Sequence, residues 1–132
     1  GRGWVEQGVD EYARRLPQLS IELIPDNPIK TQEQRMLERV PARATMVVMD
    51  ERGKQFSSRD LADQYDRWQM SGTDIWVLIG GADGFSQRAR DRADLVWSLA
   101  ASTYPHALAR VMVCEQLYRA WSMVNGHPYH RG

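Results

Sequence analysis

The sequence of 132 residues predicts an α/β fold with a mostly parallel sheet and helices on both faces. Segments with helical spacing of apolar residues alternate along the chain with short strand-like segments, which is typical of such a sheet. The most apolar segments, residues 45–49 and 75–79, lack the polar alternation of a half-exposed strand, so both of their faces should be covered. At roughly 150 residues per domain, residues 1–132 should form one domain.

The N-terminal third is predicted to contain two helices and one strand. Apolar residues recur at three- and four-residue spacing over residues 4–16, which predicts a helix that a proline ends. Apolar and polar residues then alternate over residues 19–23, which predicts a strand. Thr31 and Gln34 have the spacing of a capping box and should open a helix over residues 31–40.

The central part of the chain is predicted to form a buried strand and a helix. The strand covers residues 45–49, and residues 50–53 should form a turn after it. Ser57, followed by Asp60 three residues later, predicts the start of the helix. Gly72 predicts its end.

The C-terminal part begins with a strand over residues 75–79 and a glycine-rich turn, after which Ser86 should cap a helix. The core-facing side of that helix is expected to carry Ala89, Ala93, Val96 and Trp97. Its solvent side is expected to carry Arg88, Arg90, Asp91, Arg92 and Asp94. Residues 98–104 fit a strand or a loop, and residues 107–125 fit a long helix that a glycine ends.

The long C-terminal helix is apolar around most of its circumference. One face of a sheet cannot cover so wide an apolar surface. We therefore predict a homodimer through this helix, with deep burial inside a single chain as the alternative. Glu115 and Arg119 lie one turn apart on it and can form an ion pair.

The glycine-rich turn of residues 80–84 lies where open parallel sheets usually bind a ligand, outside the carboxyl ends of the strands. Its three glycines would let the backbone approach a ligand closely. The turn matches neither the P-loop nor the Gly-x-Gly-x-x-Gly pattern, so a phosphate cradle is not indicated. A tight strand-to-helix turn without a ligand, with Asp83 as a cap or turn residue, is an equally good interpretation.

Seventeen basic and seventeen acidic residues cancel, so the whole chain lacks the net charge that would attract it to nucleic acid or an anionic membrane. A local basic patch lies at the C-terminus, which also holds His127 and His130. This patch can contact RNA phosphates, with a frayed polar tail as the alternative. The histidines lack the spacing of zinc ligands, so no metal is predicted.

The cellular setting is predicted from two further features. The single cysteine, Cys114, excludes an internal disulfide framework and fits a reducing compartment. No apolar run approaches the roughly 18 residues of a membrane span, and no signal peptide is recognisable. We expect a cytoplasmic protein with no membrane partner.

Five motifs occur together and in a fixed order along the chain. They are Ile79-Gly80-Gly81-Ala82-Asp83-Gly84, Trp97-Ser98-Leu99, Pro105-His106, Leu117-Tyr118-Arg119-Ala120-Trp121 and His127-Pro128-Tyr129-His130-Arg131. With these motifs the sequence closely resembles the bacterial 23S ribosomal RNA pseudouridine N3-methyltransferases, which are SPOUT-class enzymes. The resemblance runs from about Trp4 to Arg131.

The resemblance implies a SPOUT-type fold with a C-terminal trefoil knot, a rare exception to the rule that protein chains are not knotted. It also implies S-adenosyl-L-methionine as the cofactor, folded within the knot and held largely by backbone groups of three loops. The residues that the resemblance assigns to this pocket are Met49, Gly81, Ala100, Ala101, Ser102, Thr103, Tyr104 and Pro105.

The resemblance further implies a homodimer that methylates N3 of a pseudouridine in 23S rRNA on assembled ribosomes. Tyr129, His130 and Arg131 would reach the site across the dimer. His130 would accept the proton or orient the base, Arg131 would contact phosphate, and Tyr129 would contact the nucleobase. Glu115 and Arg119 would shape the pocket or hold the interface.

The sequence departs from the family pattern at several points. Ala82-Asp83 replaces the usual Pro-Glu, and residues 100–104 replace a stretch richer in leucine, which puts cofactor affinity in question. Two stretches that the resemblance leads us to expect look absent from the sequence as given: a first strand before Gly1 and a basic loop near residues 27–30. Two alternatives stay open: a noncatalytic ribosome-binding or assembly factor on the same fold, and a related enzyme that methylates tRNA.

Overall fold

The computed structural model describes residues 19–23, 30–80, 84–99 and 106–126. Its elements, in chain order, are β1 (Leu19–Leu23), α2 (Lys30–Arg39), β2 (Thr45–Lys54), α3 (Ser58–Ser71), β3 (Ile75–Ile79), α4 (Gln87–Arg92), β4 (Leu95–Trp97) and α5 (His106–Val124). The helix predicted over residues 4–16 lies outside the described residues. None of the described helices is both long and apolar enough to cross a membrane.

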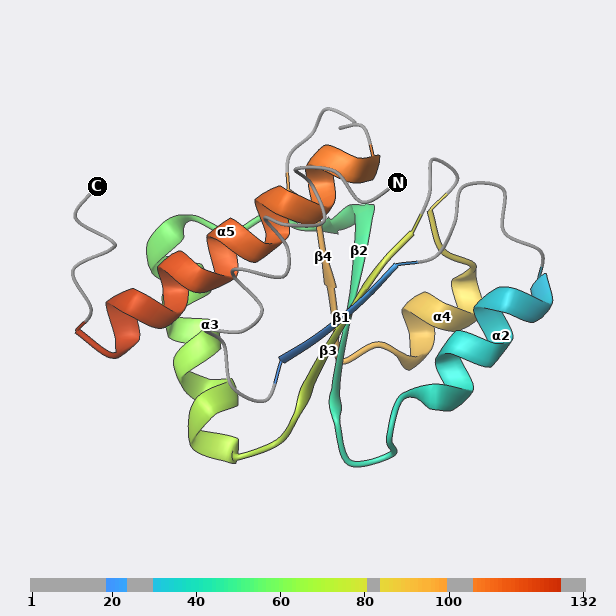
Figure 1. The fold of residues 1–132 in the computed structure, drawn as a ribbon, viewed down its shortest axis with the longest axis horizontal. Coiled ribbons are helices and arrows are strands. Elements are labelled where there is room, and N and C mark those ends of the chain that lie inside the picture. Colours follow the sequence, from blue (N-terminus) through green and yellow to red (C-terminus); the bar gives the residue numbers. More distant parts are fainter. Residues whose placement is uncertain (1–18, 24–29, 81–83, 100–105, 127–132) are drawn as a thin grey trace.

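The four described strands form one sheet in the order β1-β3-β2-β4, and every neighbouring pair is parallel. Helices α3 and α5 cover one face of this sheet, and α2 and α4 cover the other (Figure 1). The predicted α/β fold with a mostly parallel sheet and helices on both faces is therefore confirmed. The described residues do not test the predicted knot, which stays a prediction.

The core is divided by the sheet into two layers, because successive side chains of a strand point to opposite faces. In β2, Val47 and Met49 pack with α3 and α5, whereas Met46 and Val48 pack with α2 and α4. The same alternation holds along β3, where Val77 and Leu78 are both fully buried on opposite faces. Burial on both sides explains why β2 and β3 are apolar without alternation.

The predicted ends of α3 and the start of α4 are confirmed. The Ser57 hydroxyl accepts a hydrogen bond from the Asp60 N–H, and Gly72 ends α3 in the left-handed region at φ 72°. The Ser86 hydroxyl accepts in the same way from the Ala89 N–H. Helix α2 spans Lys30–Arg39 and agrees with the helix predicted over residues 31–40 to within one residue at each end, whereas the capping box at Thr31 stays a prediction.

Strand β2 is longer than predicted, because residues 50–53 continue it instead of forming a turn. Met49 and Lys54 both pair with Trp97 of β4, so the residues between them bulge from the regular register. The bulge places the backbone of Gly53 against that of β4: a Cβ atom there would lie 2.5 Å from the carbonyl oxygen of Val96.

The helix predicted from Ser86 through Trp97 is too long: α4 ends at Arg92, and residues 95–97 form β4. The cause is Asp94, which binds the edge of β2 in two ways. Its N–H donates to the Met46 carbonyl at 2.8 Å, and its carboxylate accepts from the Met46 N–H at 2.8 Å. This contact redirects the chain into the sheet, so Val96 and Trp97 become strand residues.

The C-terminal helix agrees with its prediction to within one residue at each end. Its buried side chains include Val113, Leu117 and Tyr118, which join the core layer with α3. Near the helix end, the side-chain amides of Gln69 and Asn125 exchange two hydrogen bonds of 3.1 and 3.2 Å. Ser98 and Leu99 are not in a strand, and residues 100–104 lie outside the described residues.

Substituting Gly53 with Ala should destabilise the fold by about 3 kcal/mol, because the new Cβ meets backbone atoms of β4 that cannot rotate away. Gly72→Ala provides the matched control. It introduces only the strain of a left-handed residue, about 1 kcal/mol, since no atom lies within 4 Å of its Cβ position. Urea unfolding measures both values, and an equal loss in the two variants would contradict the close approach of β2 and β4.

Candidate functional site

One row of paired residues crosses the sheet near the carboxyl ends of its strands. The register aligns Leu23 with Ile79, Ile79 with Met49, and Met49 with Trp97. The chain therefore leaves β3 at residue 80 and β4 at residue 98 on the same edge, with β2 between them. Two strand spacings separate these exits by about 10 Å.

Three segments are predicted to bind the cofactor: Met49, the turn with Gly81, and residues 100–105. The last two follow strands β3 and β4, which end in this row. Met49 lies in the row itself and is 9% exposed. Gly81 is the second residue after the end of β3, and Ala100 follows directly after Leu99, but both lie outside the described residues, as do residues 101–105. The structure thus places the anchors of the predicted pocket side by side at the edge where open parallel sheets bind ligands.

The other predicted site residues are only partly described. Tyr129, His130 and Arg131 lie outside the described residues, so their assignment stays a prediction. Glu115 and Arg119 form the predicted pair on α5, with 2.8 Å between Arg119 Nη2 and Glu115 Oε1. Their side chains are 28% and 41% exposed, respectively.

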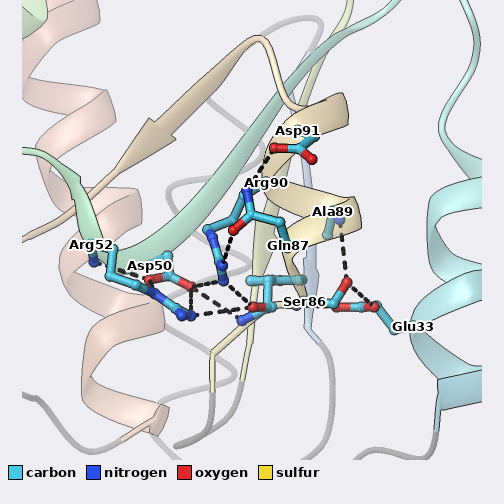
Figure 2. A network of polar contacts seen from close by, with 9 residues as sticks. Glu33, Asp50, Arg52, Ser86, Gln87, Ala89, Arg90 and Asp91 are labelled. Atoms are coloured by element: carbon cyan, nitrogen blue, oxygen red, sulfur yellow. Dashed lines mark hydrogen bonds and ion pairs between the residues drawn. The ribbon is translucent and has the colours of Figure 1, made fainter.

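A buried carboxylate, Asp50, lies directly after Met49 and organises the same edge of the sheet (Figure 2). Its Oδ1 accepts hydrogen bonds from the N–H of Arg52 at 3.0 Å and from Arg52 Nε at 2.8 Å. Its Oδ2 accepts from Arg52 Nη2 at 2.8 Å and from the Phe85 N–H at 3.1 Å. Arg90 Nη1 lies 3.9 Å from the same oxygen. The carboxylate thus links the bulge of β2 to the segment that enters α4.

The environment of Asp50 keeps it ionised. Burial is the largest influence and by itself would raise the pKa. The hydrogen bonds from the side chain and backbone of Arg52 and from the Phe85 N–H, with the charge of Arg52, together outweigh it and lower the pKa from 3.8 to about 2. In return, the carboxylate raises the pKa of the Arg52 guanidinium. The pair is therefore charged at neutral pH.

Two glycines at the ends of the turn are in close contact with this network. A Cβ at Gly80 would lie 2.9 Å from the ring of Phe85. Gly84 has φ 70°, and a Cβ there would lie 2.8 Å from Asp50 Oδ2. A residue with a side chain fits neither position. These contacts, and not only the tight turn, explain why glycine occurs at both positions.

Helix α2 supports the same region from the other side. Both oxygens of the Glu33 carboxylate accept hydrogen bonds from Ser86, one from its N–H at 2.9 Å and one from its hydroxyl at 2.7 Å (Figure 2). Arg92 donates to the carbonyls of Leu37 and Val40 near the end of α2. The start and the end of α4 are therefore both tied to α2.

The charged residues predicted for the solvent side of the helix do not all lie free in solvent, and the prediction is wrong for Arg90. Arg90 is only 15% exposed and donates to the Phe85 carbonyl at 2.5 Å. Arg92 and Asp94 are exposed but bind backbone groups of other elements. Arg88 and Asp91 are exposed, as predicted.

Sequence reasoning missed Asp50 and Arg52 because it interpreted residues 50–53 as an exposed turn. The available signal was an acidic residue directly after a buried strand, followed two residues later by an arginine. A carboxylate at that place lies at the ligand-binding edge of a parallel sheet, and an arginine can pair with it through two parallel hydrogen bonds.

No group of three His, Cys, Asp or Glu side chains suited to a metal ion occurs within the described ranges. The polar groups at the edge instead pair with one another, and the neighbouring Met49 and Trp97 are buried in the core layer with α3 and α5.

Residues 1–130 match the family model described as a predicted SPOUT methyltransferase, and the chain belongs to the SPOUT methyltransferase family. The match covers the first four motifs on which the resemblance in the sequence was based, and the fifth up to His130. It confirms the class of protein that those motifs implied.

Relatives are similar over nearly the whole chain and are named ribosomal RNA large subunit methyltransferase H. The protein from Marinomonas sp. (strain MWYL1) is 43% identical over 97% of this chain and 91% of its own length. The protein from Methylococcus capsulatus is 45% identical over the same shares. Both alignments span 141 residues against the 132 of this chain, so the relatives contain residues that this chain lacks.

Among solved structures, the SpoU methyltransferase AviRb from Streptomyces viridochromogenes in complex with AdoMet matches with a TM-score of 0.45 and 23% identity. The match covers 69% of this chain and about a third of that protein, 34% of its length.

Asp50→Asn should remove the contribution that the ionised Asp50 carboxylate makes to the free energy of unfolding. The lowered pKa of Asp50 sets the pH range over which this contribution acts. In the wild type, the contribution of Asp50 is complete above about pH 4 and disappears as the pH falls through about 2, since the pKa is lowered on folding. Over that range the wild-type free energy of unfolding should fall by about 2 kcal/mol more than that of the variant.

The measurement is urea unfolding between pH 7 and pH 2. Asp63→Asn is the control, because Asp63 is exposed on α3 and its neutralisation should leave the acid dependence of stability near that of the wild type. Parallel acid profiles for Asp50→Asn and the wild type would show that the buried pair does not act as described.

Proposed function

We propose that this protein methylates N3 of a pseudouridine in 23S rRNA on assembled ribosomes, with S-adenosyl-L-methionine as the methyl donor. The observation that carries the proposal is the similarity, over nearly the full chain, to proteins named ribosomal RNA large subunit methyltransferase H. We further propose that residues 1–132 act as a single SPOUT domain in the cytoplasm, where assembled ribosomes are found.

The proposed cofactor pocket lies at the carboxyl edge of the sheet. Met49 would contribute to its apolar floor, Gly81 would come from the turn after β3, and residues 100–105 would come from the segment after β4. The fit is supported by the register, which starts both segments on opposite sides of β2 about 10 Å apart.

When bound, the cofactor supplies a methyl group on a sulfonium, which is ready for in-line displacement by a nucleophile. The chain has to orient the base, exclude water and accept the proton that leaves N3. We assign proton acceptance or orientation of the base to His130, because an imidazole can exchange a proton near neutral pH. Tyr129 would stack on the nucleobase, and Arg131 would pair with a phosphate.

We propose that the enzyme is a homodimer through α5, with the tail of one protomer completing the site of its partner. Several apolar side chains of α5 remain partly exposed in the single chain, which supports an interface there. They are Val111, Met112, Trp121, Met123 and Val124. Tyr118, which is buried in the core, stacks on Trp121 with ring centroids 5.5 Å apart and so orients this partly exposed side chain.

The purified protein should bind S-adenosyl-L-methionine in titration calorimetry and transfer a labelled methyl group to ribosomes that lack the modification. Bound cofactor without labelled ribosomes would reject this substrate, and label on purified tRNA instead would identify a tRNA methyltransferase. If the calorimetry shows no heat of binding, the result would favour a noncatalytic ribosome-binding factor. This is the second candidate function, because residues 100–104 differ from the family pattern.

His130→Ala should lower the turnover number at least 100-fold while the dissociation constant for the cofactor changes less than twofold, since the imidazole would act on the base and not on the cofactor. Arg131→Ala is the comparison variant. It should weaken ribosome association and flatten its salt dependence, because it removes a phosphate contact. Equal loss of cofactor binding and turnover in His130→Ala would mean that the tail is structural.

A further inference from the structure

We propose that Asp50, Arg52 and Arg90 are positioning residues that hold Gly80, Gly84 and Phe85, the described residues on either side of the turn between β3 and α4, and thereby set the affinity for the cofactor. The inference rests on the proposed function, because it assigns a purpose to this turn in cofactor binding. None of the three residues was among the site residues predicted from the sequence. We name the three side chains the Asp50 clamp.

The clamp holds the backbone of one residue, Phe85, at both of its polar groups. The Phe85 N–H donates to Asp50 Oδ2 at 3.1 Å. The Phe85 carbonyl accepts from Arg52 Nη2 at 3.2 Å and from Arg90 Nη1 at 2.5 Å. Because the peptide groups on both sides of Phe85 are bonded to buried or paired charges, the end of the turn cannot rotate freely.

The start of the turn is held by the same residue. The ring of Phe85 is 3% exposed and lies so close to Gly80 that a Cβ there would approach it to 2.9 Å. At the other end, Gly84 lies against the Asp50 carboxylate. Both ends of the turn that contains Gly81 are thus fixed on β2 through Phe85 and the clamp.

The hydrogen bonds of Asp50 indicate a positioning role and not a catalytic one. Each carboxylate oxygen already accepts two hydrogen bonds, and the side chain is 0% exposed. A carboxylate so fully engaged has little capacity left for a substrate or a proton. Its effect on the reaction must therefore pass through the backbone that it holds.

Arg52 is the best position for a test, because its side chain is 52% exposed and its truncation leaves no cavity in the core. Arg52→Met keeps the length of the side chain but removes its hydrogen bonds to Asp50 and Phe85. Arg52→Lys keeps the charge but cannot form the two parallel bonds of a guanidinium. Arg88→Met is the matched control on the exposed side of α4.

The experiment measures the dissociation constant for S-adenosyl-L-methionine by calorimetry and the kcat and KM of methyl transfer to unmodified ribosomes. We expect Arg52→Met to raise the dissociation constant and the KM for the cofactor at least tenfold, with kcat at saturating cofactor within twofold of the wild type. Arg52→Lys should give an intermediate value, and Arg88→Met should match the wild type.

Unchanged cofactor affinity in folded Arg52→Met would overturn the clamp while leaving the proposed function intact. A loss of kcat without a change in KM would overturn it as well, since it would place Arg52 in the chemical step. If the wild type binds no cofactor, the proposed function fails. Amide hydrogen exchange at Phe85 then decides whether the clamp holds the turn: faster exchange in Arg52→Met supports it, and unchanged exchange overturns it.

Discussion

The structure depends on the parallel register of its four described strands. One row, from Leu23 through Ile79 and Met49 to Trp97, sets where the chain leaves the sheet. Because all strands run in the same direction, every exit lies on one edge, and segments that are distant in sequence begin next to one another. The helices that return the chain must then cover both faces, which accounts for the two core layers.

In this sheet, the buried carboxylate of Asp50 holds together the bulge of β2 and the segment that enters α4. An unpaired charge at the position of Asp50 would be costly to bury. The bulge of β2 supplies Arg52 and its backbone N–H as partners, and the start of α4 supplies the Phe85 N–H. Satisfying the charge therefore fixes the bulge and the turn together. The same atoms of Asp50, Arg52 and Phe85 therefore stabilise the fold and, in our proposal, position the backbone for the cofactor.

Much of the fold could be predicted from local signals. Ser57, Gly72 and Ser86 mark helix ends through contacts within four residues, and the apolar runs of β2 and β3 reflect burial on both faces. The motifs of the glycine turn and the tail identify the family. The site residues are still predictions: Met49 lies at the carboxyl end of the sheet, but its role in the pocket is as untested as the tail assignments of Tyr129, His130 and Arg131.

The sequence by itself determined the order of the described elements from β1 to α4, the two-sided burial of the central strands and the family. Tertiary structure alone decided that residues 50–54 continue β2, that residues 95–97 leave the helix for β4, and that Asp50 is buried. These outcomes depend on partners 35 to 48 residues away, such as Phe85 for Asp50 and Met46 for Asp94. The helix and strand propensities of nearby residues do not reflect such distant partners. The hydrogen bonds to these partners outweigh the propensities, but they exist only after the sheet has formed.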